Sequence, residues 1–287
     1  MKNGLDLEAK EWTTIIRPRK NTLRFNFKEF WQYRDLIMLL VKRDFSTIYK
    51  QTVLGPLWFL LQPLFTTIVY TFIFGKIANI GTDGIPQVLF YYSGTILWHY
   101  FQMQLTNSMD TFTANAALFS KVYFPRMIVP ISKAISNLIG FAVQLLALCA
   151  FLVYYLLTGT SVRPNILAIA LPLIILNIAM LSTGTGLIIS SLTTRYRDLR
   201  HFMTFAINLW MYATPVIYPL SIVTGNVKKL MYLNPVTPQL ELFRYGFFGT
   251  QPPELVALIG SIAASAIIFL VGLVVFNNNE RAFVDVV

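Results

Sequence analysis

Few side chains in this sequence have the types and spacing that catalysis, metal binding or phosphate binding requires. The only two histidines, His99 and His201, are far apart, and a lone histidine does not supply the three or four ligands that a bound metal requires. No G-x-x-x-x-G-K-[ST] segment occurs, so we expect no ATP site in this chain. The richest glycine cluster, STGTG at 182–186, lies in a long uncharged interval and predicts close packing of helices rather than phosphate binding. We therefore expect no catalytic residue, metal or cofactor in this chain.

Acidic residues are too scattered to indicate an active site. An enzyme acting on lipid-linked sugars would need acids near the membrane surface, and Asp83, Asp110 and Glu254 are the ones available. Their spacing makes this the weaker alternative. No charged residue lies at the centre of an uncharged interval, which argues against a carrier coupled to protons or ions.

Aromatic residues are abundant, at 15% of the chain. Most are expected to pack in the core or at the membrane surface, but some could line a channel, where flat rings suit sugar faces without requiring charge. The channel-lining candidates are Tyr70, Phe72, Tyr91, Tyr92, Trp98, Tyr100, Phe101, Trp210 and Tyr212.

Six long uncharged intervals must position these side chains. Each has at least about 25 residues, whereas a helix needs about 20 apolar residues to cross the hydrocarbon layer. Lipid-facing open strands are excluded because their backbone groups would have no hydrogen-bond partners. The sequence therefore predicts an all-α integral membrane protein with a six-helix domain over 52–280. The predicted spans are 56–76, 86–109, 131–157, 165–192, 201–219 and 255–277.

The distribution of Lys and Arg predicts the orientation. With the N-terminus inside, eighteen of them fall in cytoplasmic segments and five outside, as the positive-inside rule requires. The leader 1–29 and the tail 281–287 are then both cytoplasmic, and the polar start of the chain predicts no signal peptide. The net charge of +10 is mostly this orientation signal and does not indicate nucleic-acid binding.

Two cytoplasmic segments have the character of docking elements. Residues 33–49 place apolar side chains on one helical face and cations on the other, a pattern typical of a helix in the lipid headgroup layer. Residues 111–133 are longer than a helix connection requires and carry Pro125 and Pro130, so a short helix that docks a soluble partner is expected. The alternative for 33–49 is an amphipathic helix that only anchors the chain. The alternative for 111–133 is a plain connecting loop.

The segment 219–253 is too apolar for a solvated loop and too rich in proline to span the membrane. Two short re-entrant helices, buried against protein, would suit it. An interfacial hairpin is the alternative. Glu241 and Arg244 are three residues apart and could form an ion pair.

Three segments carry a resemblance to a known family: RDFSTIYKQTVLGPLWFLLQPL at 43–64, SKVYFPRMIVPIS at 120–132 and LNPVTPQLELFR at 233–244. They resemble the permease subunits of type-2 ABC exporters, and most closely those that export bacterial O-antigen. The resemblance implies a homodimer in the bacterial inner membrane that binds two copies of an ATP-binding subunit, which carry ATP and Mg²⁺. It also implies a lipid-linked glycan as substrate. Teichoic acid, capsule or a small molecule is the alternative cargo, and a channel or carrier that works without an ATPase is a separate alternative.

The resemblance also implies an interface helix at 30–51, a coupling helix at 113–124 and re-entrant helices within 221–250. Carried onto this sequence, the residues that contact the ATPase would be Phe45, Tyr49, Leu118, Phe119, Lys121, Tyr123, Phe124 and Arg126. The outer gate would be Leu240, Phe243 and Phe247.

Overall fold

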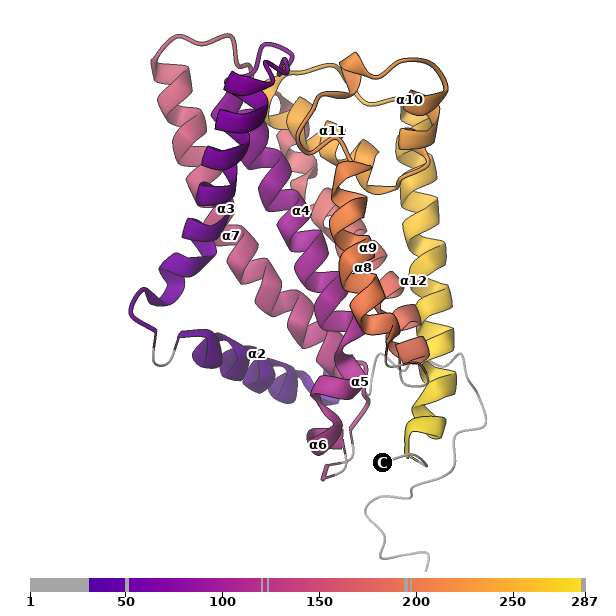
Figure 1. Cartoon of the computed structure of the whole chain (residues 1–287). Coiled ribbons are helices and arrows are strands. Elements are labelled where there is room, and N and C mark those ends of the chain that lie inside the picture. Colours follow the sequence, from indigo (N-terminus) through magenta and orange to yellow (C-terminus); the bar gives the residue numbers. More distant parts are fainter. Residues whose placement is uncertain are drawn as a thin grey trace, which may run out of the picture.

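The computed structural model describes residues 31–49, 52–119, 121–122, 124–193, 196 and 198–284, without the side chains of 48, 49, 56 and 279–284. Every regular element among these residues is helical. The long helices run side by side, and shorter ones cover the two ends of the bundle (Figure 1). We call these ends the α2 end, at the bottom of Figure 1, and the α10 end, at the top.

Four segments are long and apolar enough to cross a membrane: 58–77, 128–157, 166–193 and 255–278. The first is α3 (Trp58–Tyr70) continued by the π-helical η2 (Thr71–Ile77), and the second is α7 (Ile128–Leu157). The third joins η3 (Ile166–Ala170) to α8 (Leu171–Thr193), and the fourth lies within α12 (Leu255–Val284). The fold is therefore that of an all-helical protein with several potential membrane spans.

Two further helices of the bundle differ from these four. The helix α4 (Gln87–Met109) is long enough to span, but it carries too many polar side chains to meet the same hydropathy limit. The helix α9 (Leu199–Tyr212) has 14 residues, which corresponds to about 21 Å. It ends seven residues before the expected end at 219. The residues that follow it, including Pro215, form turns instead. A proline cannot donate a backbone hydrogen bond, so it favours this early end.

The glycine cluster at 182–186 packs helices together, as the sequence predicted. A Cβ on Gly184 would lie 2.5 Å from Cα of Phe269, and one on Gly272 would lie 2.5 Å from the Gly184 carbonyl oxygen. These distances show that α8 and α12 meet backbone to backbone. Gly186 lets α8 approach α4 in the same way, because its Cβ would meet the Leu105 carbonyl oxygen at 2.7 Å.

Polar side chains bond the core helices to one another. Nε2 of Gln104 on α4 donates to Oγ1 of Thr183 on α8 at 2.8 Å, and Nδ2 of Asn137 on α7 donates to Oε1 of Gln104 at 2.8 Å. Nδ2 of Asn107 donates to Oδ1 of Asn137 at 3.1 Å. Because α4 is enclosed by its neighbours, these amides find partners inside the protein, where lipid would offer none.

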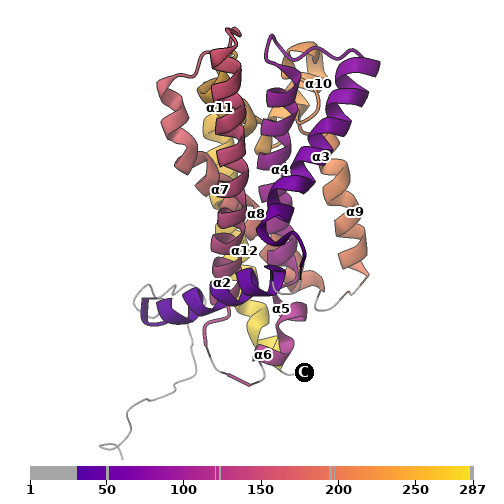
Figure 2. The ribbon, with the colours of Figure 1, turned by 90° about the vertical axis from the view of Figure 1, so that its left-hand side faces the viewer.

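Short helices cover both ends. At the α2 end, α2 (Arg34–Tyr49) lies across the bundle, with α5 (Thr111–Ala114) and α6 (Ala116–Phe119) beside it (Figure 2). The predicted helix at 113–124 is therefore two single turns, and its described residues beyond Phe119 are not helical. At the α10 end lie η4 (Leu220–Ile222), α10 (Gly225–Tyr232) and α11 (Val236–Phe248) (Figure 1). Gly249 ends α11 with a φ of 72°, a left-handed conformation that glycine adopts without strain.

Candidate functional site

The helix α2 is joined to α7 by apolar packing and by an ion pair. Leu40 packs in one buried cluster with Phe124, Ile128 and Val129. Asp44 is also buried. It forms an ion pair with Lys133 on α7, and the distance between Oδ2 of Asp44 and Nζ of Lys133 is 2.9 Å. The helix α2 is therefore held to the first turns of α7 by both kinds of contact.

A second cluster joins the segment 111–127 to α12. The rings of Phe112 on α5 and Phe276 on α12 are stacked, with their centroids 4.5 Å apart. The guanidinium of Arg126 lies over the rings of Phe112 and Phe119, at 5.8 and 5.3 Å from their centroids. Neither Phe112 nor Phe276 was singled out from the sequence. No local pattern could reveal a contact between residues so far apart in the chain.

The residues predicted to contact an ATPase differ in exposure. Lys121 and Phe45 are exposed, while Leu118 and Phe119 are half-buried. Phe124 and Arg126 are buried in the two clusters just described, so a partner could not reach them directly in this conformation. Tyr123 and the side chain of Tyr49 lie outside the described part of the chain. Their contact with an ATPase stays a prediction, and in this conformation both side chains pack inside the chain.

Most of the aromatic channel candidates are core residues of the single chain. The side chains of Tyr91, Tyr92, Trp98, Tyr100 and Phe101 are buried, so in this conformation they pack rather than line a route. They were candidates because uncharged aromatic rings suit sugar faces, and residue type alone does not distinguish a ring in the core from one that lines a channel.

The remaining candidates lie closer to the surface. Tyr70 and Trp210 are half-buried, and Trp210 contacts Phe101 with ring centroids 5.1 Å apart. Phe72 and Tyr212 are more than half exposed. They lie on η2 and α9, and Figures 1 and 2 together show α3 and α9 on the same side of the molecule, with α4 behind them. This side therefore presents exposed aromatic surface.

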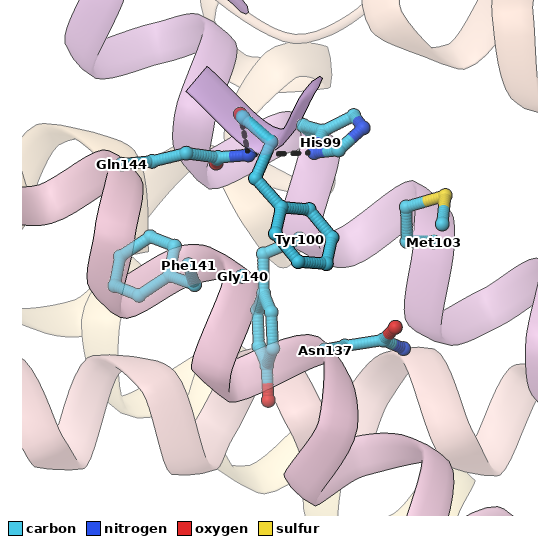
Figure 3. A pocket seen from close by; sticks show the side chains of 8 residues that line it. His99, Tyr100, Met103, Asn137, Gly140, Phe141 and Gln144 are labelled. Carbon is cyan, nitrogen blue, oxygen red and sulfur yellow. Dashed lines mark hydrogen bonds between the residues drawn. The ribbon is translucent and has the colours of Figure 1, made fainter. Parts of the chain in front are cut away.

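A small pocket between α3, α4 and α7 holds His99 (Figure 3). Nε2 of Gln144 donates to the Phe59 carbonyl oxygen at 3.0 Å and lies 3.3 Å from Nδ1 of His99. Because an amide nitrogen can only donate, this contact favours the His99 tautomer with its proton on Nε2. No group of three or more His, Cys, Asp or Glu side chains that could hold a metal occurs among the described residues. The contact of His99 with Gln144 joins α4 to α7.

The α10 end is organised around Arg244. Its guanidinium donates to the carbonyl oxygens of Pro215 at 2.7 Å, Val216 at 2.9 Å and Phe90 at 3.3 Å. It also lies 3.7 Å from the centroid of the Phe90 ring. The pairing with Glu241 that the sequence suggested is not formed, because the two carbonyl groups of the turn after α9 are nearer to the guanidinium. Arg244 thereby ties α11 to α4 and to that turn.

The three residues predicted to form an outer gate lie on α11. Leu240, Phe243 and Phe247 are all buried, and the rings of Phe243 and Phe247 are 4.7 Å apart. They pack α11 into the core of the single chain. Their role as a gate stays a prediction.

The comparison with known proteins decides the family. The sequence model described as ABC-2 type transporter matches residues 35–248, which is well over half of the chain. The chain belongs to the ABC-2 transporter family. Proteins of this family are membrane transport components, and the family implies a partner subunit that binds ATP.

Similar proteins in bacteria cover nearly the whole ABC-2 chain. Two are named O-antigen export system permease protein RfbA from Klebsiella pneumoniae. Each is 28% identical, over 258 and 255 residues, and both alignments cover 88% of this chain and 95% of the relative. A third, of the same name, comes from Myxococcus xanthus and is 25% identical over 260 residues, with 90% and 97% covered.

Proposed function

We propose that this chain is the membrane permease of an ATP-driven exporter that moves a lipid-linked polysaccharide, with O-antigen as the preferred cargo, across the bacterial inner membrane. The observation that carries the proposal is the match to the ABC-2 family together with similarity, over nearly the full chain, to permeases named for O-antigen export. Two copies of this chain would pair with two ATP-binding subunits, which would hold ATP and Mg²⁺.

The structure supports a membrane arrangement with six spans and both termini in the cytoplasm. Lys42 lies on α2, Lys133 pairs with Asp44 of α2, and Arg200 pairs with Asp110 at the end of α4. From the positive-inside rule we infer that the α2 end is cytoplasmic. The polar helix α4 can lie at membrane depth because protein surrounds it, and α9 reaches further with the turns that follow it. We infer that α10 and α11 are the re-entrant pair at the outer end.

The α2 end has the contacts needed to transmit motion from an ATPase. A partner that binds the exposed surface of α2 and the segment around Lys121 would move α7 through Asp44–Lys133 and α12 through Phe112–Phe276. The ion pair between Asp110 at the end of α4 and Arg200 at the start of α9, 2.7 Å long, would carry α9 along. ATP-driven closure would thus reach α7, α9 and α12 at once.

The exposed side of α3, η2 and α9 is the surface on which we place the second copy and the route between the copies. It carries exposed apolar side chains: Phe65, Ile68, Phe72, Phe202, Phe205 and Tyr212. Rings without charge suit the apolar faces of sugars, and they leave the lipid anchor free to stay in the bilayer. This replaces the buried rings of α4 as the proposed channel lining.

Reconstitution tests the function directly. The tagged chain is purified, its co-purifying partners are identified, and the complex is placed in liposomes with a lipid-linked O-antigen on the ATP side. We expect an ATP-binding subunit to co-purify and the glycan to become accessible on the far side only with hydrolysable ATP. A partner unable to hydrolyse ATP is the control. Translocation by the chain without an ATPase would refute the proposal, and movement of a small molecule but not the glycan would favour the alternative cargo.

A further inference from the structure

Two amide side chains meet at the accessible surface between α4 and α9. Nε2 of Gln102 on α4 donates to Oδ1 of Asn208 on α9 at 3.2 Å. Each of the two residues lies eight positions from the ion pair of Asp110 and Arg200, which joins the same helices at the α2 end. Eight residues of helix span about 12 Å. A charged pair belongs at the membrane surface, and the hydrocarbon layer is about 30 Å thick, so the proposed membrane arrangement puts the amide pair at hydrocarbon depth.

The amide pair keeps hydrogen-bonding groups that the described chain does not use. Oε1 of Gln102 and Nδ2 of Asn208 have no hydrogen-bond partner among the described residues. Asn208 is an exposed side chain, and Oε1 of Gln102 is not closed off inside the protein. Lipid would leave both groups without partners, whereas Gln104 and Asn137, which also lie within the bundle, bond to each other. The pair therefore faces water or a polar cargo rather than lipid.

Other exposed helix surfaces of this protein lack such groups. On α7 over 134–153 and on α12 over 255–277, every exposed position is an apolar side chain or glycine. Leu146 of α7 and Leu270 of α12, which are 71% and 60% exposed, are examples. These surfaces suit lipid, and the amide pair distinguishes the surface between α4 and α9 from them.

Aromatic rings flank the amide pair on α9. Phe205 lies three residues before Asn208 and Tyr212 four residues after it, so the three side chains share one face of the helix. Both rings are more than half exposed. A flat ring offers an apolar surface to the C–H face of a sugar, while an amide offers a donor and an acceptor to its hydroxyls. Rings with an uncharged amide between them therefore suit a chain of neutral, hydroxyl-bearing units better than an ionic or a wholly apolar cargo.

We propose that Gln102 and Asn208 are specificity-determining residues, which bind the hydroxyl groups of a glycan that passes along α4 and α9 in a water-filled route. The identity of the cargo rests on the proposed function, whereas the water-filled route rests on the exposed amides. A single uncharged amide binds a hydroxyl weakly, so the contact passes from one sugar to the next without trapping the chain.

Thiol accessibility tests the water-filled route without any cargo. The single cysteine of the chain, Cys149, is replaced by serine, and Asn208→Cys or Leu146→Cys is introduced into the full-length chain with its ATP-binding partner. Inside-out membrane vesicles are treated with a charged, membrane-impermeant methanethiosulfonate, with and without ATP. We expect Asn208→Cys to react about tenfold faster than Leu146→Cys in one of the two conditions, because a thiol ionises in water but not in hydrocarbon. Gln102→Cys is the second labelling position if Asn208→Cys fails to reach the membrane.

Export kinetics test the contact with cargo. Gln102→Leu and Asn208→Leu each remove one side of the amide pair without adding charge, and ATP-driven export is measured over a range of lipid-linked glycan concentrations. We expect the half-saturating glycan concentration to rise about three- to tenfold in each variant, and Asn208→Gln, which keeps an amide, to recover part of the loss. The control is Leu209→Ala, next to Asn208 on α9 and 52% exposed, which should keep the wild-type half-saturation.

The outcomes separate this inference from the proposed function. Equally slow labelling of the Asn208 and Leu146 cysteines in both conditions overturns the route, and wild-type half-saturation in both leucine variants overturns the cargo contact, even if ATP-dependent export is intact. If the wild-type complex exports no glycan, the proposed function fails and the cargo contact with it, while fast labelling of Asn208→Cys still supports the water-filled route.

Discussion

Replacement of Arg244 by methionine should destabilise the α10 end more than any other single change of charge there. The side chain is buried and makes three hydrogen bonds, two of them to the carbonyl groups of Pro215 and Val216, which lie outside any helix. A hydrogen bond from a charged donor contributes about 1.5–3 kcal/mol. The guanidinium no longer has to be desolvated in the variant, which offsets part of this loss. We expect a net loss of about 3–5 kcal/mol in the free energy of unfolding.

The assay is thermal unfolding of the purified chain in detergent micelles, followed by tryptophan fluorescence. A loss of this size corresponds to a decrease of roughly 10 °C in the apparent Tm. Arg163→Met is the matched control, because Arg163 lies at the same end but is exposed. Its effect should be within about 0.5 kcal/mol. Arg244→Lys should recover only part of the loss, since an ammonium cannot reproduce the planar fork. If Arg244→Met and Arg163→Met unfold within 2 °C of each other, the hydrogen bonds of Arg244 do not stabilise this end.

Three further predictions follow from packing, titration and coupling. Gly272→Ala places a methyl group against the backbone of α8 and should lower the free energy of unfolding by about 1–3 kcal/mol. Gly260→Ala on the same helix meets open space and should not cause this loss, and a comparison of Tm values checks both variants. Burial raises the pKa of Glu241 to about 7 from its ordinary 4.5, so its contribution to stability is largest below pH 4.5 and declines as the pH rises toward 7. Glu241→Gln should abolish about 2–3 kcal/mol of this decline, and equal pH profiles for both proteins would contradict it. A double-mutant cycle of Phe112→Ala and Phe276→Ala should give a coupling energy of about 0.5–1.5 kcal/mol, with ATP hydrolysis less tightly linked to export; additive effects would argue against the contact.

The helices themselves could be read from the chain because their signals are local. Long uncharged intervals indicate helices of membrane length, since lipid offers no partner to a free backbone group. The glycines at 184 and 186 also gave a local signal. Glycine has no side chain, so a neighbouring helix can approach the backbone closely at these positions. The amphipathic pattern over 33–49 likewise indicated a helix, and α2 forms there.

The partners of the buried polar and aromatic side chains could not be read in this way. Periodicity shows that a ring on α4 faces some neighbour, but the choice between core and channel depends on which helices enclose α4. Arg244 and Glu241 were paired in the prediction because they are close in the chain, yet Arg244 binds carbonyl groups from a turn almost thirty residues away. The stacking of Phe112 on Phe276 joins residues still further apart.

Composition and charge pattern were sufficient to predict an all-helical membrane protein and its orientation, because each depends on residue type within one segment. The hydrogen bonds of Arg244 at the α10 end, the link from α2 to α7 and the exposed side of α3 and α9 arose from folding. Each depends on distances between segments that the linear order does not encode, and these distances exist only once the helices have packed.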